Sequence, residues 1–231
     1  MSTYLDILIA TFIGGMMLLM LHTASNNAHQ AFMNNNADAI TQQNIARLTK
    51  ILQHDLRKMG FNVPEKDQHT TIVRAESNRI KFLTHLNGDP HCRVQIPGIN
   101  YLDNLADTIE YYIYPKQYVT LIDTTIVLYS VRRTITIPPS YQHQMDIGLI
   151  ANGEVFRFLD QVGRPVKNPS ATKIVEVTVK SLNPRIVLSP EYVVEQLSQI
   201  KDPVYLEQEL KRLLKPSYWR QTRLISRNLN R

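Results

Sequence analysis

The sequence predicts an α+β protein in which one long N-terminal helix packs on an antiparallel β-sheet head. Two patterns predict this fold. Up to Met59, apolar residues recur at intervals of three and four, the spacing of one helix face. After Gly60 they alternate with polar residues, the spacing of a half-buried strand. One helix followed by a series of strands is typical of the α+β class.

The composition of the 231-residue chain is that of an ordinary globular protein, with 43% hydrophobic and 20% charged residues. Its length fits one β-rich domain with an added element. Because Cys92 is the only cysteine, an internal disulfide framework is excluded. The formal charge of +6 is concentrated in residues 201–231, which hold eight basic and three acidic residues. We expect this basic tail to be mainly a solvated surface.

Residues 1–24 are expected to form a transmembrane or filament-core helix. Residues 7–21 carry no charge, and extension to Tyr4 and Ala24 adds only Asp6 and His22 as interruptions. A bilayer core takes roughly 20 apolar residues in a helix. The residues before the apolar run carry no positive charge, unlike the start of a secretory signal peptide, so we expect the segment to be retained.

Asp6 is the unusual residue of this segment. A carboxylate at the end of an apolar helix is costly, and such residues usually have a partner and a function. The residue also lies in the first turn of the predicted helix, where the helix dipole favours negative charge. Asp6 is therefore either an assembly residue or a helix-start residue in the lipid headgroup region.

Residues 25–60 are predicted to continue the same helix as an amphipathic segment. Leu48, Leu52 and Leu56 recur every four residues and are expected to pack on the head. Gly60 provides a left-handed C-terminal cap. The weakest part is the Asn-rich stretch at 34–36, where a kink is plausible because Asn competes with helical hydrogen bonds.

The head, residues 61–231, is predicted to be β-rich. Its expected strands cover residues 70–75, 78–83, 108–114, 118–122, 125–137, 155–159 and 173–182. Glu76-Ser77 is expected to form the turn of the first hairpin. His143 lies in a segment rich in Pro, Gln and His that is interpreted as a turn.

Two segments interrupt this series of strands. Residues 84–106 are predicted to be a long loop, and residues 190–215 a helical insertion. Leu206, Leu210 and Leu213 or Leu214 mark an amphipathic face in the insertion. This face either covers the head's own sheet, which we favour, or docks a neighbouring subunit.

The N-terminus resembles the mature start of type IV pilins and type II secretion pseudopilins. With Met1 removed, the chain starts Ser-Thr-Tyr-Leu-Asp and continues with a hydrophobic stretch, so Asp6 takes the position of the family's acidic fifth residue. Ser2 stands where most members have an N-methylated Phe. The resemblance implies that Asp6 pairs with the amine of Ser2, in its own chain or in a neighbouring subunit, during assembly. It also implies that Ile9, Ile13 and Gly14 belong to the assembly surface.

The resemblance extends along the chain to the PilW-like minor pilins and the J-type pseudopilins. The segments that match in order are 55–61, 78–82 with 107–112, 156–160 and 222–229. It implies a structural, non-enzymatic subunit in the inner membrane, with its head in the periplasm or outside the cell. The implied partners are other pilin or pseudopilin subunits, the inner-membrane assembly platform and membrane lipid. Neither a metal nor a cofactor is expected.

The residues that could carry other chemistry are few. His85, Asp89, His91 and Cys92 have no zinc-site spacing. Asn87, Asp89, Asp103 and Asp107 offer the oxygen ligands that calcium prefers, but we do not expect a calcium site either. No phosphate-binding glycine loop or nucleophile elbow is present, so an enzyme is not expected. In residues 218–227, aromatic and basic side chains alternate between the two faces of the expected terminal strand, which makes a nucleic-acid surface unlikely.

Two other functions remain open from the sequence. The first is a single-pass envelope protein that presents a β-rich interaction domain and does not polymerise. The second is a DNA-binding pilin of an uptake pilus, which the basic tail suggests.

Overall fold

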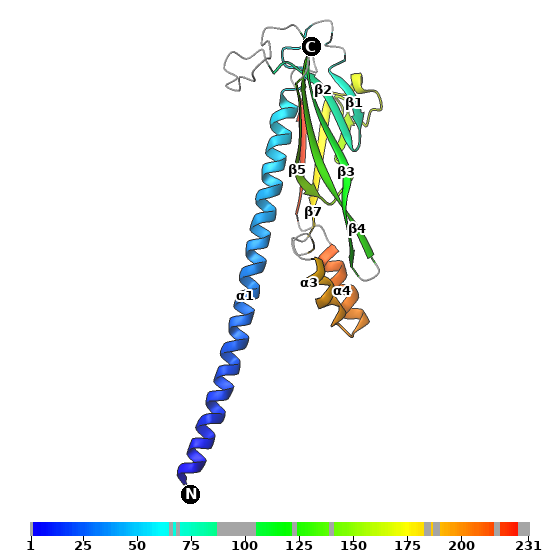
Figure 1. Cartoon of the computed structure of the whole chain (residues 1–231). Helices are drawn as coiled ribbons and strands as arrows, with labels where there is room; N and C mark the ends of the chain where they lie inside the picture. The colour runs from blue at the N-terminus through cyan, green and yellow to red at the C-terminus, as the bar shows by residue number, and fades with distance from the viewer. Residues whose placement is uncertain are drawn as a thin grey trace. The chain divides into compact units, whose positions relative to one another are not determined.

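A computed structural model of the chain (Figure 1) describes residues 2–64, 67, 70–86, 105–121, 124–138, 141–182, 186, 190–214 and 218–225. The chain divides into two compact units, Met1–Thr41 and Gln42–Arg231. The helix α1 (Ser2–Arg57) provides the whole described part of the first unit and the start of the second. The second unit holds all the strands and is called the head below.

α1 confirms the prediction of one long helix. Its 56 residues are helical throughout, including the Asn-rich stretch at 34–36, where a kink was considered plausible. The helix ends at Arg57, and Gly60, three residues later, has the predicted left-handed φ of 71° but does not directly follow the helix as a cap residue. The amide of Gly60 donates a hydrogen bond of 2.9 Å to the carbonyl of Leu83, which ties the end of the helix to the sheet.

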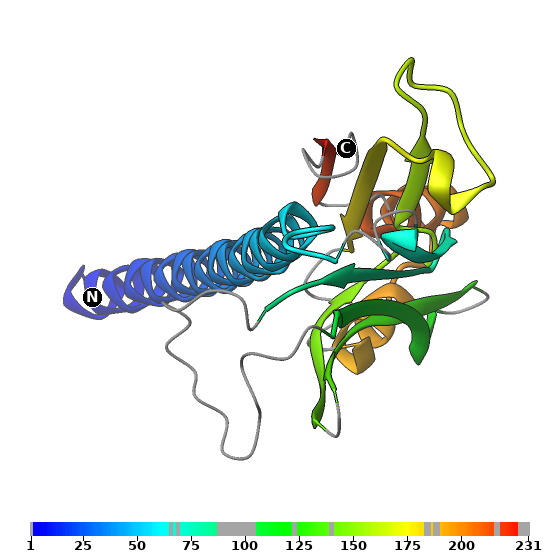
Figure 2. The same cartoon turned by 90° about the horizontal axis from the view of Figure 1, so that it is seen from above.

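The head contains a five-stranded and a three-stranded antiparallel sheet. The larger has the order β1 (Ile72–Glu76), β2 (Arg79–Thr84), β3 (Asp107–Leu121), β4 (Thr124–Ile137), β5 (Tyr141–Ile150). The smaller has the order β6 (Phe156–Leu159), β7 (Ile174–Ser181), β8 (Tyr218–Ile225). Figure 2 shows them as two separate groups of strands. The α+β class is therefore as predicted, but the strands form two sheets and not one.

Three predictions of local structure need correction. The strands expected at 108–114 and 118–122 are one strand, β3, with a register shift between Pro115 and Gln117. Proline has no N–H to donate to the ladder, so the strand passes it through an irregularity and continues. The segment around His143, expected to be a turn, is strand β5. The first hairpin turns at Ser77-Asn78, because Glu76 pairs with Arg79.

Helices α3 (Pro190–Ser198) and α4 (Pro203–Leu214) form the predicted insertion, and a short 3-10 helix, η2 (Pro169–Ala171), precedes β7. A first core cluster joins the C-terminal part of α1 to both sheets. A second cluster joins α3 and α4 to the far ends of β3 and β4. Leu206 and Leu210 pack against this second cluster, so the amphipathic face of the insertion covers the head's own strands.

Candidate functional site

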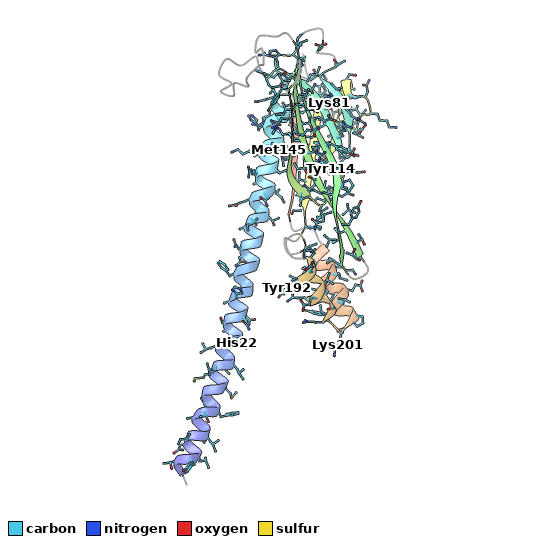
Figure 3. All side chains as sticks on the ribbon, viewed as in Figure 1. His22, Lys81, Tyr114, Met145, Tyr192 and Lys201 are labelled. Atoms are coloured by element: carbon cyan, nitrogen blue, oxygen red, sulfur yellow. The ribbon has the colours of Figure 1, made fainter. Side chains whose placement is uncertain are left out.

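The N-terminal helix has an apolar surface that nothing in the structure covers. Thr3–His29 forms a stretch of 27 residues that is long and apolar enough to cross a membrane, and none of it is buried. At 1.5 Å per residue it measures about 40 Å, against about 30 Å for the hydrocarbon core of a bilayer. In Figure 3 the side chains of this segment project from the helix without packing partners. Such a surface needs lipid or other protein around it.

The residues predicted for assembly lie on this exposed segment. Ile9 is 49% and Ile13 is 47% exposed, and a Cβ added to Gly14 would meet no atom within 4 Å. Asp6 is exposed and shares one helix face with Ile9 and Ile13, three and seven residues later. Because α1 begins at Ser2, Asp6 lies beyond the first turn, which contains no acidic residue, so its expected first-turn position was wrong.

The pairing of Asp6 with the amine of Ser2 stays a prediction. Met1 and the side chain of Ser2 lie outside the described residues, so this end of the chain does not test the contact. The three leucines predicted to pack on the head, Leu48, Leu52 and Leu56, are at most 2% exposed and belong to the first core cluster.

A buried polar cluster joins α1 to the larger sheet. The side chain of Asp55, 2% exposed, accepts a hydrogen bond of 2.5 Å from the Tyr111 hydroxyl on β3. The same carboxylate oxygen accepts one of 2.6 Å from Nε of Arg133 on β4. Burial raises the pKa of Tyr111 well above its usual value, and the negative charge of Asp55 adds to this shift. Tyr111 is therefore a hydrogen-bond donor at all physiological pH values, and the cluster fixes the helix on the sheet.

The role of Asp55 differs from the prediction, in which its segment is only a helix end. A signal was present. Asp55 lies three residues after Leu52 and four before Met59, on the face that is otherwise apolar. A carboxylate on a buried face needs a hydrogen-bonded partner, which Arg133 supplies.

Two further polar clusters lie on the sheets. Asp146 on β5 accepts hydrogen bonds from the Tyr114 hydroxyl at 2.7 Å, Lys116 Nζ at 3.0 Å and Arg132 Nε at 3.1 Å. Partial burial acts to raise the pKa of Asp146, but these three donors outweigh it and hold the pKa well below its usual value. Tyr114 is labelled on the sheet in Figure 3.

On the smaller sheet, Glu176 of the central strand β7 lies between two arginines. Its side chain is 1% exposed and contacts Arg157 of β6 at 3.3 Å and Arg223 of β8 at 2.8 Å. These cross-strand pairs hold the three strands in register. Arg223 of the basic C-terminal segment thus has a structural partner within the head.

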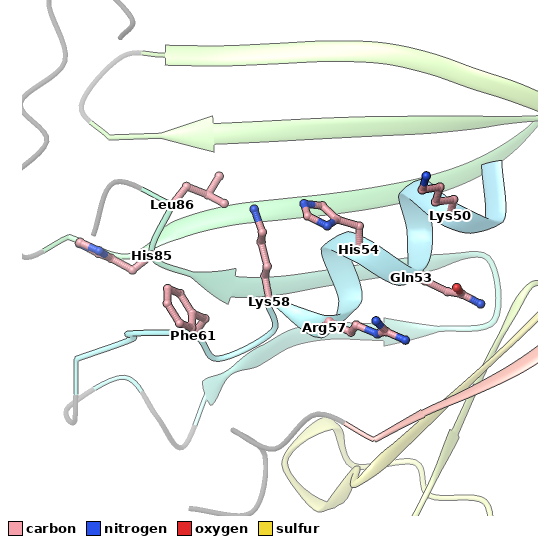
Figure 4. A pocket seen from close by; sticks show the side chains of 8 residues that line it. All are labelled: Lys50, Gln53, His54, Arg57, Lys58, Phe61, His85 and Leu86. Atoms are coloured by element: carbon pink, nitrogen blue, oxygen red, sulfur yellow. The ribbon is translucent and has the colours of Figure 1, made fainter. Parts of the chain in front are cut away.

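A basic pocket lies beside the C-terminal end of α1 (Figure 4). Its volume is about 580 Å³, and its lining residues are Lys50, Gln53, His54, Arg57, Lys58, Phe61, His85 and Leu86. In the figure Lys50, His54 and Lys58 extend to one side of the helix, and Gln53 and Arg57 to the other. No carboxylate belongs to this lining, so the pocket attracts anions.

The remaining candidates lie largely outside the described residues. Among the described residues, no group of three His, Cys, Asp or Glu side chains is close enough to hold a metal ion. The loop residues considered for zinc or calcium lie outside them: Asn87, Asp89, His91, Cys92 and Asp103. So do residues 226–231 of the basic tail and the side chains of residues 218–221.

The described geometry thus offers an uncovered apolar helix, a firm joint between that helix and the head, and a basic pocket at the joint. Comparisons with models of known protein families, with curated proteins and with solved structures find no match to this chain.

Proposed function

We propose that this protein is a structural subunit of a type IV pilin-like filament, either a minor pilin or a pseudopilin, and has no enzymatic activity. The observation that carries the proposal is the uncovered apolar helix of Thr3–His29 with Asp6 near its start. The helix waits in the cytoplasmic membrane and is then transferred into a filament core. There, helices of neighbouring subunits replace lipid around its apolar side chains.

Asp6 gives the proposal its specificity. A simple membrane anchor does not need a carboxylate in its apolar segment, where an ionised Asp costs about 2.5–3.5 kcal/mol at the helix centre on insertion scales and less toward the end, where Asp6 lies. In a filament the carboxylate meets an α-amino group, and this charge pair offsets the cost. Ile9 and Ile13 on the same helix face supply apolar contact beside the pair.

The joint between helix and head supports the same function. A filament subunit has to carry force from the helix to the head without separating the two. The first core cluster and the Asp55 carboxylate connect the last part of α1 to both sheets within one compact unit. This arrangement suits a load-bearing subunit, and it equally suits a non-polymerising anchor, so Asp6 decides between them.

The test compares Asp6→Ala with Asp6→Glu in the cells that make the protein. Membranes and sheared surface filaments are separated, and the chain is quantified by immunoblot in each. We expect the alanine variant to remain in the membrane while its filament fraction falls at least ten-fold, the equivalent of about 1.4 kcal/mol. The glutamate variant keeps the charge and retains part of the filament fraction. If alanine leaves the filament fraction unchanged, or if wild-type chain never leaves the membrane, the protein is a single-pass anchor.

A further inference from the structure

The cations of the basic pocket have a regular spacing and lack partners in the described part of the chain. Lys50, His54 and Lys58 follow one another every four residues, so their Cα atoms are about 6 Å apart along the helix. Neither lysine forms a salt bridge with any described residue, and the same holds for Arg57 on the neighbouring face.

The usual role of basic residues at a helix C-terminus does not account for this set. The helix dipole places about half a negative charge there, which one cation is enough to offset. Two lysines and Arg57 give three positive charges. The one acidic residue in the same two turns is Asp55, which does not line the pocket and is paired with Arg133. A positive excess therefore remains, and it faces a concave surface.

At another place in the head, two glutamates show the complementary pattern. Glu191 and Glu195 lie four residues apart on α3, so the same spacing of about 6 Å separates them. Both are exposed and neither forms a salt bridge with a described residue. By contrast, Glu207 of α4 is paired with Lys211 at 2.6 Å. We call Glu191 and Glu195 the acidic pair of α3.

The acidic pair and the basic pocket cannot meet within one molecule. The pocket includes His85, next to β2 residue Thr84, which pairs with Asp107 at the start of β3. The acidic pair borders a groove of about 420 Å³ that includes Tyr118, near the end of β3. Eleven residues of strand separate Asp107 from Tyr118, which is about 36 Å. Figure 1 shows α3 at one end of β3 and the end of α1 at the other.

Each of these surfaces also exposes an aromatic side chain. Phe61 in the basic pocket is 42% exposed, and Tyr192, between the two glutamates in sequence, is 48% exposed. Aromatic residues are enriched where proteins associate. The two ends of the head therefore match in charge, in spacing and in the type of apolar side chain.

We propose that the acidic pair of α3 in one copy of this chain binds the basic pocket of a second copy. Glu191 and Glu195 contact two members of the Lys50–His54–Lys58 row, and Tyr192 lies against Phe61. Because the two surfaces differ and lie at opposite ends of the head, the contact repeats from copy to copy and does not close a dimer. The inference rests on the proposed filament function, because assembly into a filament is what brings copies of the chain end to end.

The test uses two charge-reversed variants of the full chain in non-ionic detergent. The first, K50E/K58E, has an acidic pocket, and the second, E191K/E195K, has a basic α3. Neither variant can form the contact with itself. In a mixture, the acidic α3 of the first variant can bind the basic pocket of the second, with the native charges. The basic α3 of the second variant can bind the acidic pocket of the first, with the charges exchanged. Misfolded variants would not regain the contact on mixing. A zero-length carbodiimide joins a carboxylate to an amine in contact with it, and mass spectrometry identifies the linked peptides. Mixing isotope-labelled and unlabelled chains shows which links join different copies.

We expect wild-type chain to give a link between the peptides of Lys58 and Glu195. Each variant alone lacks one of the two reacting groups and gives no such link, so the mixture and the salt dependence carry the test. The equimolar mixture regains the link, and about 0.5 M salt weakens it in the wild type. The control E207K/K211E reverses a surface pair of α4 and keeps the wild-type yield. Asp6→Ala leaves the link intact even where it abolishes filaments, so the two proposals fail separately.

Three results would overturn the contact. They are a wild-type yield that about 0.5 M salt leaves unchanged, a mixture that shows no rescue, and no linked peptides from wild-type chain at about millimolar concentration. If wild-type chain gives no link but a 20-nucleotide oligodeoxythymidylate binds it through Lys50 and Lys58, the pocket belongs to nucleic acid instead.

Discussion

Replacing Asp55 by Asn should weaken the head more than any change to an exposed charge. Asn keeps the size of the side chain but removes the carboxylate that accepts hydrogen bonds from Tyr111 and Arg133 at 2.5 and 2.6 Å. Hydrogen bonds to a charged group contribute about 1.5–3 kcal/mol each. Removing one partner of a buried ion pair costs about 3–5 kcal/mol.

The exposure of Arg133 sets the expected value within these ranges. Its side chain is 20% exposed, so water partly stabilises the guanidinium that Asp55→Asn leaves without a counter-charge. We therefore expect a loss of about 3 kcal/mol in the free energy of unfolding. In a domain of this size that corresponds to a fall of roughly 6–12 °C in melting temperature.

Urea unfolding of the full chain in detergent, followed by near-ultraviolet circular dichroism, measures this loss. Tyr111→Phe removes one donor and should cost about 1.5–3 kcal/mol. The pair Asp55→Leu with Arg133→Met removes both charges and should cost less than Asp55→Asn alone. Lys116→Met, which removes an exposed partner of Asp146, should cost less than about 1 kcal/mol. A loss below about 1 kcal/mol for Asp55→Asn would show that the cluster does not hold the helix.

Three further outcomes are expected from urea unfolding. A Cβ at Gly148 would lie 2.6 Å from Cδ1 of Leu48, so Gly148→Ala should lower the free energy of unfolding by about 1–3 kcal/mol. Adding Leu48→Val should relieve part of this loss. If the losses of the two single variants simply add in the double variant, the side chains do not clash. Gly60 has a φ of 71°, so Gly60→Ala should lower the free energy of unfolding by about 1–2 kcal/mol. Gly14 lies in ordinary helix geometry with open space around it, so Gly14→Ala should not destabilise the protein. The pKa of Asp146 is lower in the folded protein than in the unfolded chain, so its stabilisation is complete above about pH 5 and is lost as the pH falls through the pKa of the unfolded chain, about 4, toward that of the folded protein. Asp146→Asn should therefore remove part of the fall in stability between about pH 5 and pH 2.5, and equal falls in both proteins would refute this.

The parts of the fold that the sequence predicted are those with a strict apolar period. In β3, Ile109, Tyr111 and Ile113 alternate with polar neighbours, and all three are at most 2% exposed. Strand β5 was missed because its first residue, Tyr141, is followed by Gln142, His143 and Gln144, and six of its ten residues are exposed, so no period of two is visible. It is a strand because β4 offers it a hydrogen-bonding edge, which local sequence does not reveal.

The candidate site was less accessible to prediction than the fold. The apolar segment and Asp6 are local features and were visible in the sequence. The Asp55 cluster joins residues 56 and 78 positions apart, and only tertiary structure brings them together. The basic pocket combines a helix with residues after β2, so the sequence showed its lysines but not its shape.

Because the head has two separate core clusters, we expect it to unfold in steps. α3 and α4 rest on the second cluster, where Leu121, Val193 and Leu197 are at most 4% exposed, while the joint with α1 rests on the first. Groups of residues with their own core often exchange amide hydrogens as independent cooperative units. A mild rise in temperature or denaturant is then expected to release α3 and its glutamates while α1 stays fixed to the sheets. The proposed contact between copies would then be released while α1 of each copy stays packed on its own sheets.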